Sequence, residues 1–200
     1  ARECVEGAPR RALAARHLDQ LRDRVLPRLA PLARSVIHND ANDHNLLIAS
    51  DAGGRPTLAG LIDFGDILHT VTVAELAVAC AYLMLDRDEP VSDAARVVAG
   101  YHAVRPLSPA EQVVLFDLIV ARLCASVLIA AGRLQTEPDN EYLQISVQPV
   151  WRLLERLSAL DRERAGQRLE EACAPATPPT RSDDEIVAVR RRHLGRNLSL

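Results

Sequence analysis

Two short polar segments carry side chains of the kinds that phosphoryl transfer requires. The first, His38-Asn39-Asp40-Ala41-Asn42-Asp43-His44-Asn45, has the pattern H-x-D-x-x-x-x-N. The second, Asp63-Phe64-Gly65-Asp66, comes after a predicted β-hairpin. Either pattern alone arises by chance. The two in this order, with a hairpin between them, indicate chemistry of the phosphoryl-transfer class.

The residue types suggest how such chemistry would work. A transferring phosphoryl group needs its charge neutralised by a divalent cation and its attacking hydroxyl held in line. Mg²⁺ prefers oxygen ligands, which makes the Asn45 amide and the Asp63 carboxylate the candidate metal ligands. Asp40, earlier on the same loop as Asn45, is the candidate catalytic residue, because its carboxylate can orient or deprotonate a substrate hydroxyl.

Further polar side chains flank these three. Candidates for contact with substrate, phosphate or metal-bound water are Asp43, His44, Asp66 and His69. Each has an ordinary alternative, because loop aspartates build turns and histidines beside such loops serve as hydrogen-bonded supports. Glu75 lies in a largely apolar segment, and a buried carboxylate needs a partner, so we expect a structural ion pair with an arginine.

The expected strands explain how the two polar segments can meet. Residues 9–33 have the apolar spacing of an amphipathic helix, and short strands are expected at 35–37, 46–48 and 58–62. A turn at 51–54 makes the last two strands a hairpin. The hairpin folds the chain back, so that Asp63 can face Asn45.

After residue 72 the pattern is helical. The 73–85 segment is apolar enough to be buried, and a second helix is expected to begin at Ser92. Ser108-Pro109-Ala110-Glu111 has a capping-box pattern that opens a helix to about Gly132, and further helix covers 141–172 with a break near Pro149. The predicted fold class is α+β, a mostly helical lobe with a small β-hairpin that carries the catalytic and metal residues.

Composition excludes several kinds of site and partner. The chain has 24 arginines and no lysine, so it contains no P-loop lysine, no kinase-type phosphate-binding lysine and no lysine for a pyridoxal phosphate Schiff base. A net charge of −3 and 3% aromatic residues argue against a nucleic-acid partner. Asp117 and Arg122 interrupt the apolar 113–131 stretch, which favours a core helix over a membrane span, so no membrane partner is expected.

The cysteines point to a reducing compartment. Cys4, Cys80, Cys124 and Cys173 are far apart, and none forms a C-x-x-C pair. This spacing fits neither a zinc site nor a dense disulfide framework. We therefore expect free thiols and a cytoplasmic location.

The two polar segments resemble the catalytic C-lobe of the aminoglycoside phosphotransferase and choline kinase superfamily, relatives of protein kinases. The likeness covers about residues 10–165. The sequences of residues 38–45 and 61–70 are most similar to those of hydroxylysine kinase-type members. The resemblance implies that Asp40 is the catalytic aspartate, that Asn45 and Asp63 bind the metal, and that His38 supports the loop. It also implies Mg²⁺ with ATP or GTP as donor, and a small-molecule acceptor hydroxyl on an amino alcohol or hydroxylated amino acid.

The resemblance further implies a domain organisation. An N-lobe with the phosphate-binding lysine is expected upstream of residue 1, so residues 1–173 would be a partial, C-lobe domain that is close to inactive alone. Residues 174–182 read as a Pro-rich linker. Residues 183–200, with the run from Arg190 to Leu200, resemble the lead-in to a class III aminotransferase domain. The alternative is a solvated basic helix end. Pyridoxal phosphate would belong only to that downstream domain.

Two other kinds of protein stay open on the sequence. One is a non-catalytic kinase-like module within a multidomain aminotransferase protein, against which the intact Asp40, Asn45 and Asp63 count. The other is a metal-dependent phosphohydrolase that uses the same carboxylates. Such an enzyme needs no lysine, but its usual motifs are absent from the sequence.

Overall fold

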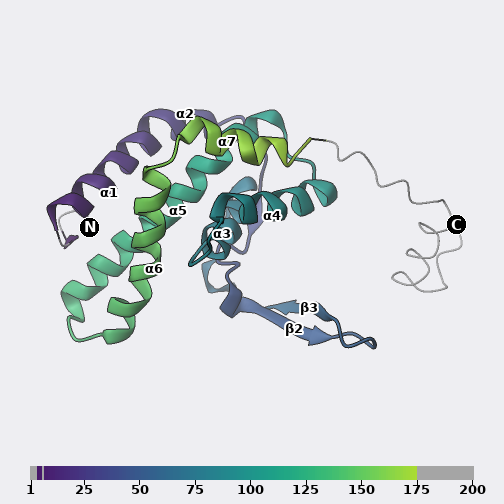
Figure 1. Ribbon diagram of the computed structural model, residues 1–200, viewed down its shortest axis with the longest axis horizontal. Helices are drawn as coiled ribbons and strands as arrows, with labels where there is room; N and C mark the ends of the chain where they lie inside the picture. The colour runs from purple at the N-terminus through teal and green to yellow at the C-terminus, as the bar shows by residue number, and fades with distance from the viewer. Residues whose placement is uncertain (1–3, 6, 175–200) are drawn as a thin grey trace, which may run out of the picture.

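A bundle of helices forms the body of the protein (Figure 1). The structure is a computed structural model and describes residues 4–5 and 7–174. The predicted aminotransferase lead-in at 183–200, and all but the first residue of the predicted linker at 174–182, lie outside the described residues. Both stay predictions. The helices are α1 (Ala8–Gln20), which continues through a π-helical turn at Leu21–Val25 into α2 (Leu26–Leu29), then α3 (Val73–Leu83), α4 (Pro90–Val104), α5 (Pro109–Thr136), α6 (Glu141–Ser158) and α7 (Arg162–Glu171).

Helix α5 is the centre of this body. It packs against α1, α3, α6 and α7, and its buried positions include Val114, Ile119, Leu123 and Val127. By length and composition alone α5 could cross a membrane, yet half of its most apolar window is buried inside the protein. The prediction of a core helix over 113–131 is confirmed, because most of its apolar side chains are buried in the core, although Val113 and Ile129 are exposed.

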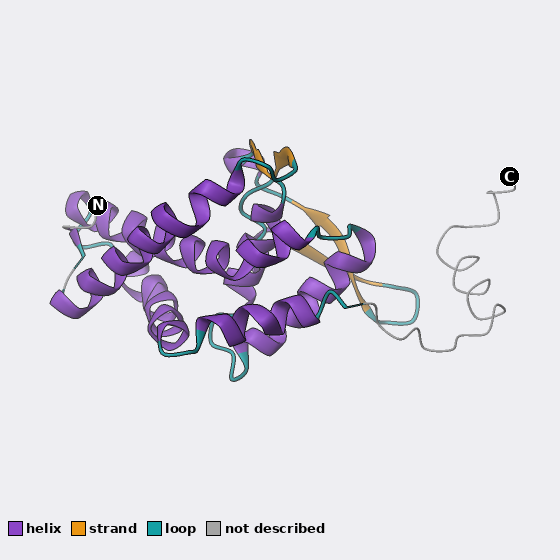
Figure 2. Ribbon diagram, turned by 90° about the horizontal axis from the view of Figure 1, so that it is seen from above, coloured by secondary structure: helices purple, strands orange, loops and turns teal. Residues whose placement is uncertain are grey.

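The strands form two separate antiparallel pairs. Strand β1 (Arg34–Ile37) pairs with β4 (Leu68–Val71), and β2 (Leu46–Ser50) pairs with β3 (Pro56–Leu61). The β2–β3 hairpin projects from the helical body, as Figures 1 and 2 show. Because the chain runs β1, loop, β2, β3, loop, β4, the loops 38–45 and 62–67 both lie where the two strand pairs adjoin. This nesting is what brings the two polar segments together.

The mostly helical α+β prediction is confirmed, but one strand was missed and two local expectations were wrong. The missed strand is β4, which forms because β1 supplies a partner. Of the two wrong expectations, the first concerns α4, which begins at Pro90 rather than at Ser92, with proline at the first helical position. The second concerns α6, which runs unbroken through Pro149, and the break falls after Ser158 instead. The apolar face of α6 is buried against α5, and this packing outweighs the hydrogen bond that proline removes.

The described cysteines are free thiols, as the sequence predicted. Burial raises the pKa of the Cys80 thiol to about 12 and that of Cys124 to about 11. At neutral pH both thiols are therefore protonated, and they behave as small apolar core residues.

The capping box at the start of α5 is confirmed. The Ser108 hydroxyl accepts a hydrogen bond from the Glu111 N–H at 3.3 Å, and a Glu111 carboxylate oxygen accepts one from the Ser108 N–H at 2.8 Å. Arg105 donates to the same carboxylate at 2.8 Å. Burial alone would raise the pKa of Glu111, but the hydrogen bonds from Ser108 and Arg105 outweigh burial and lower this pKa below its usual 4.5.

Replacing Glu111 with glutamine should therefore destabilise the fold in a pH-dependent way. We expect a loss of about 1–2 kcal/mol in the free energy of unfolding at pH 7, because charged cap and ion-pair hydrogen bonds are lost. The folded pKa lies below the unfolded one, so the carboxylate stabilises the fold above about pH 4.5 and loses that contribution as pH falls through the folded pKa.

Urea unfolding of wild type and Glu111→Gln at pH 7 and pH 3 measures this effect. The stability gap between the two proteins should narrow at pH 3. The same substitution at the exposed Glu141, in the first turn of α6, is the control and should cost less than about 0.5 kcal/mol at pH 7. A gap of constant size at both pH values would show that the Glu111 charge does not stabilise the fold.

Candidate active site

The Asp40 carboxylate is held by three side-chain donors. Its Oδ2 accepts hydrogen bonds from Asn42 Nδ2 and Asn45 Nδ2, each at 3.0 Å. Its Oδ1 accepts one from Arg122 Nη2 at 2.9 Å. Asn45 Nδ2 also donates to the Asp40 backbone carbonyl at 2.8 Å. The carboxylate is thereby fixed from within the loop on one oxygen and from helix α5 on the other.

The loop backbone before Asp40 takes an unusual conformation. Asn39 has φ 66°, in the left-handed region that asparagine tolerates better than most residues. Its N–H donates to Glu75 Oε2 at 3.0 Å. The expected Glu75–arginine pair was therefore wrong: Glu75 lies in the first turn of α3, and its carboxylate meets this backbone N–H instead. Its other oxygen, Oε1, is buried without a hydrogen-bond partner among the described residues.

His38 links the two polar segments. Its Nε2 lies 2.8 Å from the Ile62 carbonyl, and its Nδ1 lies 3.3 Å from the Asp40 backbone nitrogen. A carbonyl only accepts and a backbone N–H only donates, so the neutral ring carries its proton on Nε2. The ring also packs edge-on against Phe64, with centroids 4.8 Å apart. His38 thus ties the Asp40 loop to the Asp63 loop.

Asp63 begins the second loop in a left-handed conformation, with φ 62°. Its Oδ1 accepts a hydrogen bond from the Gly65 N–H at 3.3 Å, and a Cβ at Gly65 would lie 3.2 Å from that oxygen. The neighbouring Ile62 N–H donates to the Asn45 carbonyl at 3.0 Å. The backbones that carry the two predicted metal ligands are therefore adjacent.

The chemistry of these two side chains fits a hard cation. The Asn45 amide nitrogen faces two acceptors, which fixes the amide orientation and leaves its oxygen as the group that a cation would contact. Asp63 adds an exposed carboxylate. Among the described residues no group of three or more His, Cys, Asp or Glu side chains is placed to hold a metal. A site here would rest on one carboxylate, one amide, phosphate oxygens and water, as Mg²⁺ allows.

Of the four flanking candidates, three lie on the two loops and His69 lies on β4, and all four are outside this network. Asp43 and His44 are exposed in a short 3-10 turn, Asp66 is exposed in another, and His69 is exposed on β4 opposite Val36. Within the described part of the chain, no hydrogen bond or ion pair joins their side chains to Asp40, Asn45 or Asp63. Their part in substrate binding stays a prediction.

The sequence analysis missed the role of Arg122, which contacts Asp40, and of Tyr82, which contacts Arg122. Arg122 forms an ion pair with Asp40 and donates to the Tyr82 hydroxyl at 2.8 Å. Its guanidinium carbon lies 5.3 Å from the centroid of the Tyr82 ring. The sequence signal that could have revealed this role is an arginine within the otherwise apolar 113–131 stretch. The sequence analysis used that arginine only as evidence against a membrane span.

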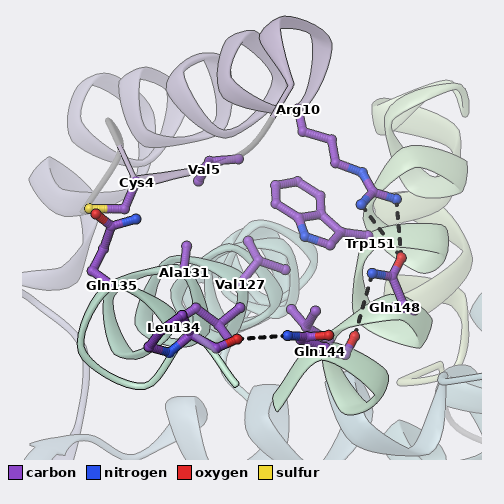
Figure 3. Close-up of a pocket in the computed structure, with 12 residues that line it drawn as sticks. Cys4, Val5, Arg10, Val127, Ala131, Leu134, Gln135, Gln144, Gln148 and Trp151 are labelled. Carbon is purple, nitrogen blue, oxygen red and sulfur yellow. Dashed lines mark hydrogen bonds between the residues drawn. The ribbon is translucent and has the colours of Figure 1, made fainter. Parts of the chain in front are cut away.

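A cavity of about 380 Å³ lies elsewhere, between α1, α5 and α6 (Figure 3). Arg10 lies over the Trp151 ring, 5.0 Å from its centroid, and pairs with Glu155 at 3.0 Å. None of the residues that line this cavity belongs to the loops at 38–45 or 62–67, so it is separate from the candidate active site. The lining includes Cys4, Val127, Ala131, Leu134, Gln135, Gln144 and Gln148.

Comparison with known proteins identifies the family to which this chain belongs. The model of the phosphotransferase enzyme family matches residues 2–116, so the chain belongs to that family. It is 31% identical to the hydroxylysine kinase of Danio rerio over 165 residues, which is 82% of this chain and 46% of that protein. It is 32% identical to the hydroxylysine kinase of Bos taurus over 158 residues, 76% of this chain and 42% of that protein. The chain thus spans less than half the length of these relatives.

Proposed function

We propose that this chain is the catalytic-loop lobe of a small-molecule kinase. It would transfer the γ-phosphoryl group of ATP or GTP to a hydroxyl on a hydroxylated amino acid or an amino alcohol. The observation that carries the proposal is the Asp40 carboxylate, fixed by Asn42, Asn45 and Arg122 where the two loops adjoin. The similarity to hydroxylysine kinases supports the acceptor class.

Asp40 would act on the acceptor hydroxyl. Phosphoryl transfer depends mainly on positioning and on electrostatic stabilisation, with an aspartate that accepts the hydroxyl proton or orients it. Both acceptor sites of Oδ2 are taken by the loop amides, whereas among the described residues Oδ1 holds one donor, from Arg122. The second acceptor site of Oδ1 is therefore the one that would receive the substrate hydroxyl.

Asn45 and Asp63 would hold Mg²⁺ through the amide oxygen and the carboxylate. Bound there, the ion would neutralise charge on the donor phosphates. His38 would keep the two loops in register through its hydrogen bonds to Ile62 and Asp40.

A further lobe would cover the exposed apolar side chains of the hairpin and of the loop that follows it. Ile48 and Leu58, which pair across β2 and β3, are 62% and 65% exposed, and Phe64 on the 62–67 loop is 56% exposed. Large exposed apolar side chains on adjoining segments are a feature of binding surfaces. The curated relatives are more than twice as long as their matched part, and this chain has no lysine to bind phosphate. We therefore expect phosphoryl transfer from the complete gene product and close to none from these 200 residues alone.

Metal binding tests the site without requiring turnover. Titrating the 200-residue chain with Mn²⁺ or Mg²⁺ should raise its Tm by roughly 3–6 °C when the free metal concentration is about ten times Kd. The Tm rises because a ligand that binds only the folded state stabilises it. Asp63→Ala should abolish the rise, because it removes the only carboxylate of the proposed pair. Asp88→Ala, at an exposed aspartate on the α3–α4 connection, is the control and should keep it.

Equal stabilisation of wild type and Asp63→Ala would contradict the metal assignment. The reaction class is tested separately, by phosphoryl transfer from ATP or GTP to hydroxylysine or ethanolamine. Phosphate release from a phosphomonoester without nucleotide would favour the phosphohydrolase alternative. Metal binding by a complete gene product that transfers no phosphoryl group would favour the non-catalytic module.

A further inference from the structure

We propose that Arg122 is a positioning residue, which sets the orientation of the Asp40 carboxylate from outside the catalytic loop. The inference rests on the proposed function, because it assigns Arg122 a part in the same reaction. Arg122 lies on α5, 82 residues from Asp40 in the sequence. The contact therefore couples the loop to the central helix of the body.

Arg122–Asp40 is one of the few partly buried ion pairs of the described residues, together with Arg105–Glu111 and Arg162–Asp117. Most of the other ion pairs link neighbours on one helix or turn, or lie on the surface. In the Arg122–Asp40 pair each side chain is only 21% exposed, and the Nη2–Oδ1 distance is 2.9 Å. Partial burial weakens the screening by solvent, so this pair holds its geometry more firmly than an exposed one.

Tyr82 fixes Arg122 in turn. The same Nη2 that contacts Asp40 donates to the Tyr82 hydroxyl at 2.8 Å, and the guanidinium lies beside the Tyr82 ring. Arg122 Nε is buried and has no hydrogen-bond partner among the described residues. Leaving a buried donor unsatisfied costs free energy, so packing alone does not favour an arginine here. The ion pair with Asp40 offsets the cost of burying the unpartnered Nε.

The geometry explains what Arg122 would do in the reaction. Asn42 and Asn45 hold Oδ2, but both come from the same loop and move with it. In the described part of the chain, Arg122 supplies the one side-chain contact to Oδ1, and it comes from outside the loop. Arg122 therefore determines where that oxygen faces the acceptor hydroxyl. Without Arg122 the carboxylate can tilt about its Oδ2 contacts. Such a tilt would slow the chemical step and would leave nucleotide binding unchanged.

Kinetics of Arg122 variants in the complete gene product test the inference. Arg122→Met should lower kcat about 100-fold with the KM for nucleotide within about twofold, because a small misplacement of a reacting group costs this much. Arg122→Lys should recover about tenfold of the lost kcat, since it restores a charged donor without the planar fork. Tyr82→Phe should lower kcat about threefold, because Arg122 keeps its contact to Asp40 but loses its own anchor. Arg133→Met, which removes a surface partner of Glu137 on the same helix, is the control and should leave kcat unchanged.

The outcomes separate the inference from the proposed function. If wild type transfers phosphoryl groups and folded Arg122→Met keeps kcat within about twofold, Arg122 does not position Asp40 and only the inference fails. If wild type transfers none, the proposed function fails and the inference fails with it. A purely structural role would lower Tm or raise KM without the kcat loss. If Arg122→Met does not fold, unchanged kcat in both Arg122→Lys and Tyr82→Phe overturns the inference.

Discussion

Asp40→Asn should lower kcat for phosphoryl transfer by about 10³-fold, the range expected when a general base is lost. The side chain keeps its shape, but an amide cannot take the hydroxyl proton. The new side-chain amide must also place its NH₂ group against either Arg122 or the Asn42 and Asn45 amides. All of these groups are donors, so at least one hydrogen-bond contact is lost in either orientation. The measurement is kcat at saturating nucleotide and acceptor, in the complete gene product.

Asp88→Asn, at an exposed aspartate remote in sequence from both loops, is the matched control and should keep the wild-type rate. Metal-induced stabilisation should persist in Asp40→Asn, because neither proposed metal ligand is changed. If kcat of Asp40→Asn stays within about tenfold of wild type, Asp40 is not the base and the catalytic assignment fails.

Ile119→Ala should reduce the free energy of unfolding by about 2–5 kcal/mol, the cost of opening a cavity in a packed core. Ile119 is completely buried at the middle of α5, where that helix packs against α3, α6 and α7. Urea unfolding of the 200-residue chain measures the change.

Ile129→Ala makes the same substitution on the same helix at a side chain that is 60% exposed. Helix propensity changes equally in the two variants, so their difference isolates burial. We expect the Ile129 variant to lose less than about 1 kcal/mol. Equal losses would show that α5 does not form the core as the structure places it.

Local signals were enough for several elements. The capping box at Ser108 and Glu111 was predicted because its two partners lie within one helical turn. The β2–β3 hairpin was predicted because the 51–54 turn joins two short apolar strands. In each case the interaction that stabilises the element is encoded by neighbours in the sequence.

Elements that depend on distant partners were missed or misplaced. Strand β4 is only four residues long and gains its hydrogen bonds from β1, which lies in another part of the sequence. Pro149 looks like a break in isolation, but α6 persists because its apolar face is buried against α5. Glu75 was paired with the wrong kind of partner, because only the fold places it under the Asn39 backbone.

The sequence alone determined the chemistry of the candidate site, because the residue types at 38–45 and 63–66 and their spacing restrict what the two loops can do. Tertiary structure alone decided how Asp40 is oriented. The carboxylate takes its direction from Arg122 on α5, and Arg122 from Tyr82 on α3. No local sequence pattern in either helix predicts these contacts. The Arg122–Asp40 contact spans 82 residues and forms only when the core packs.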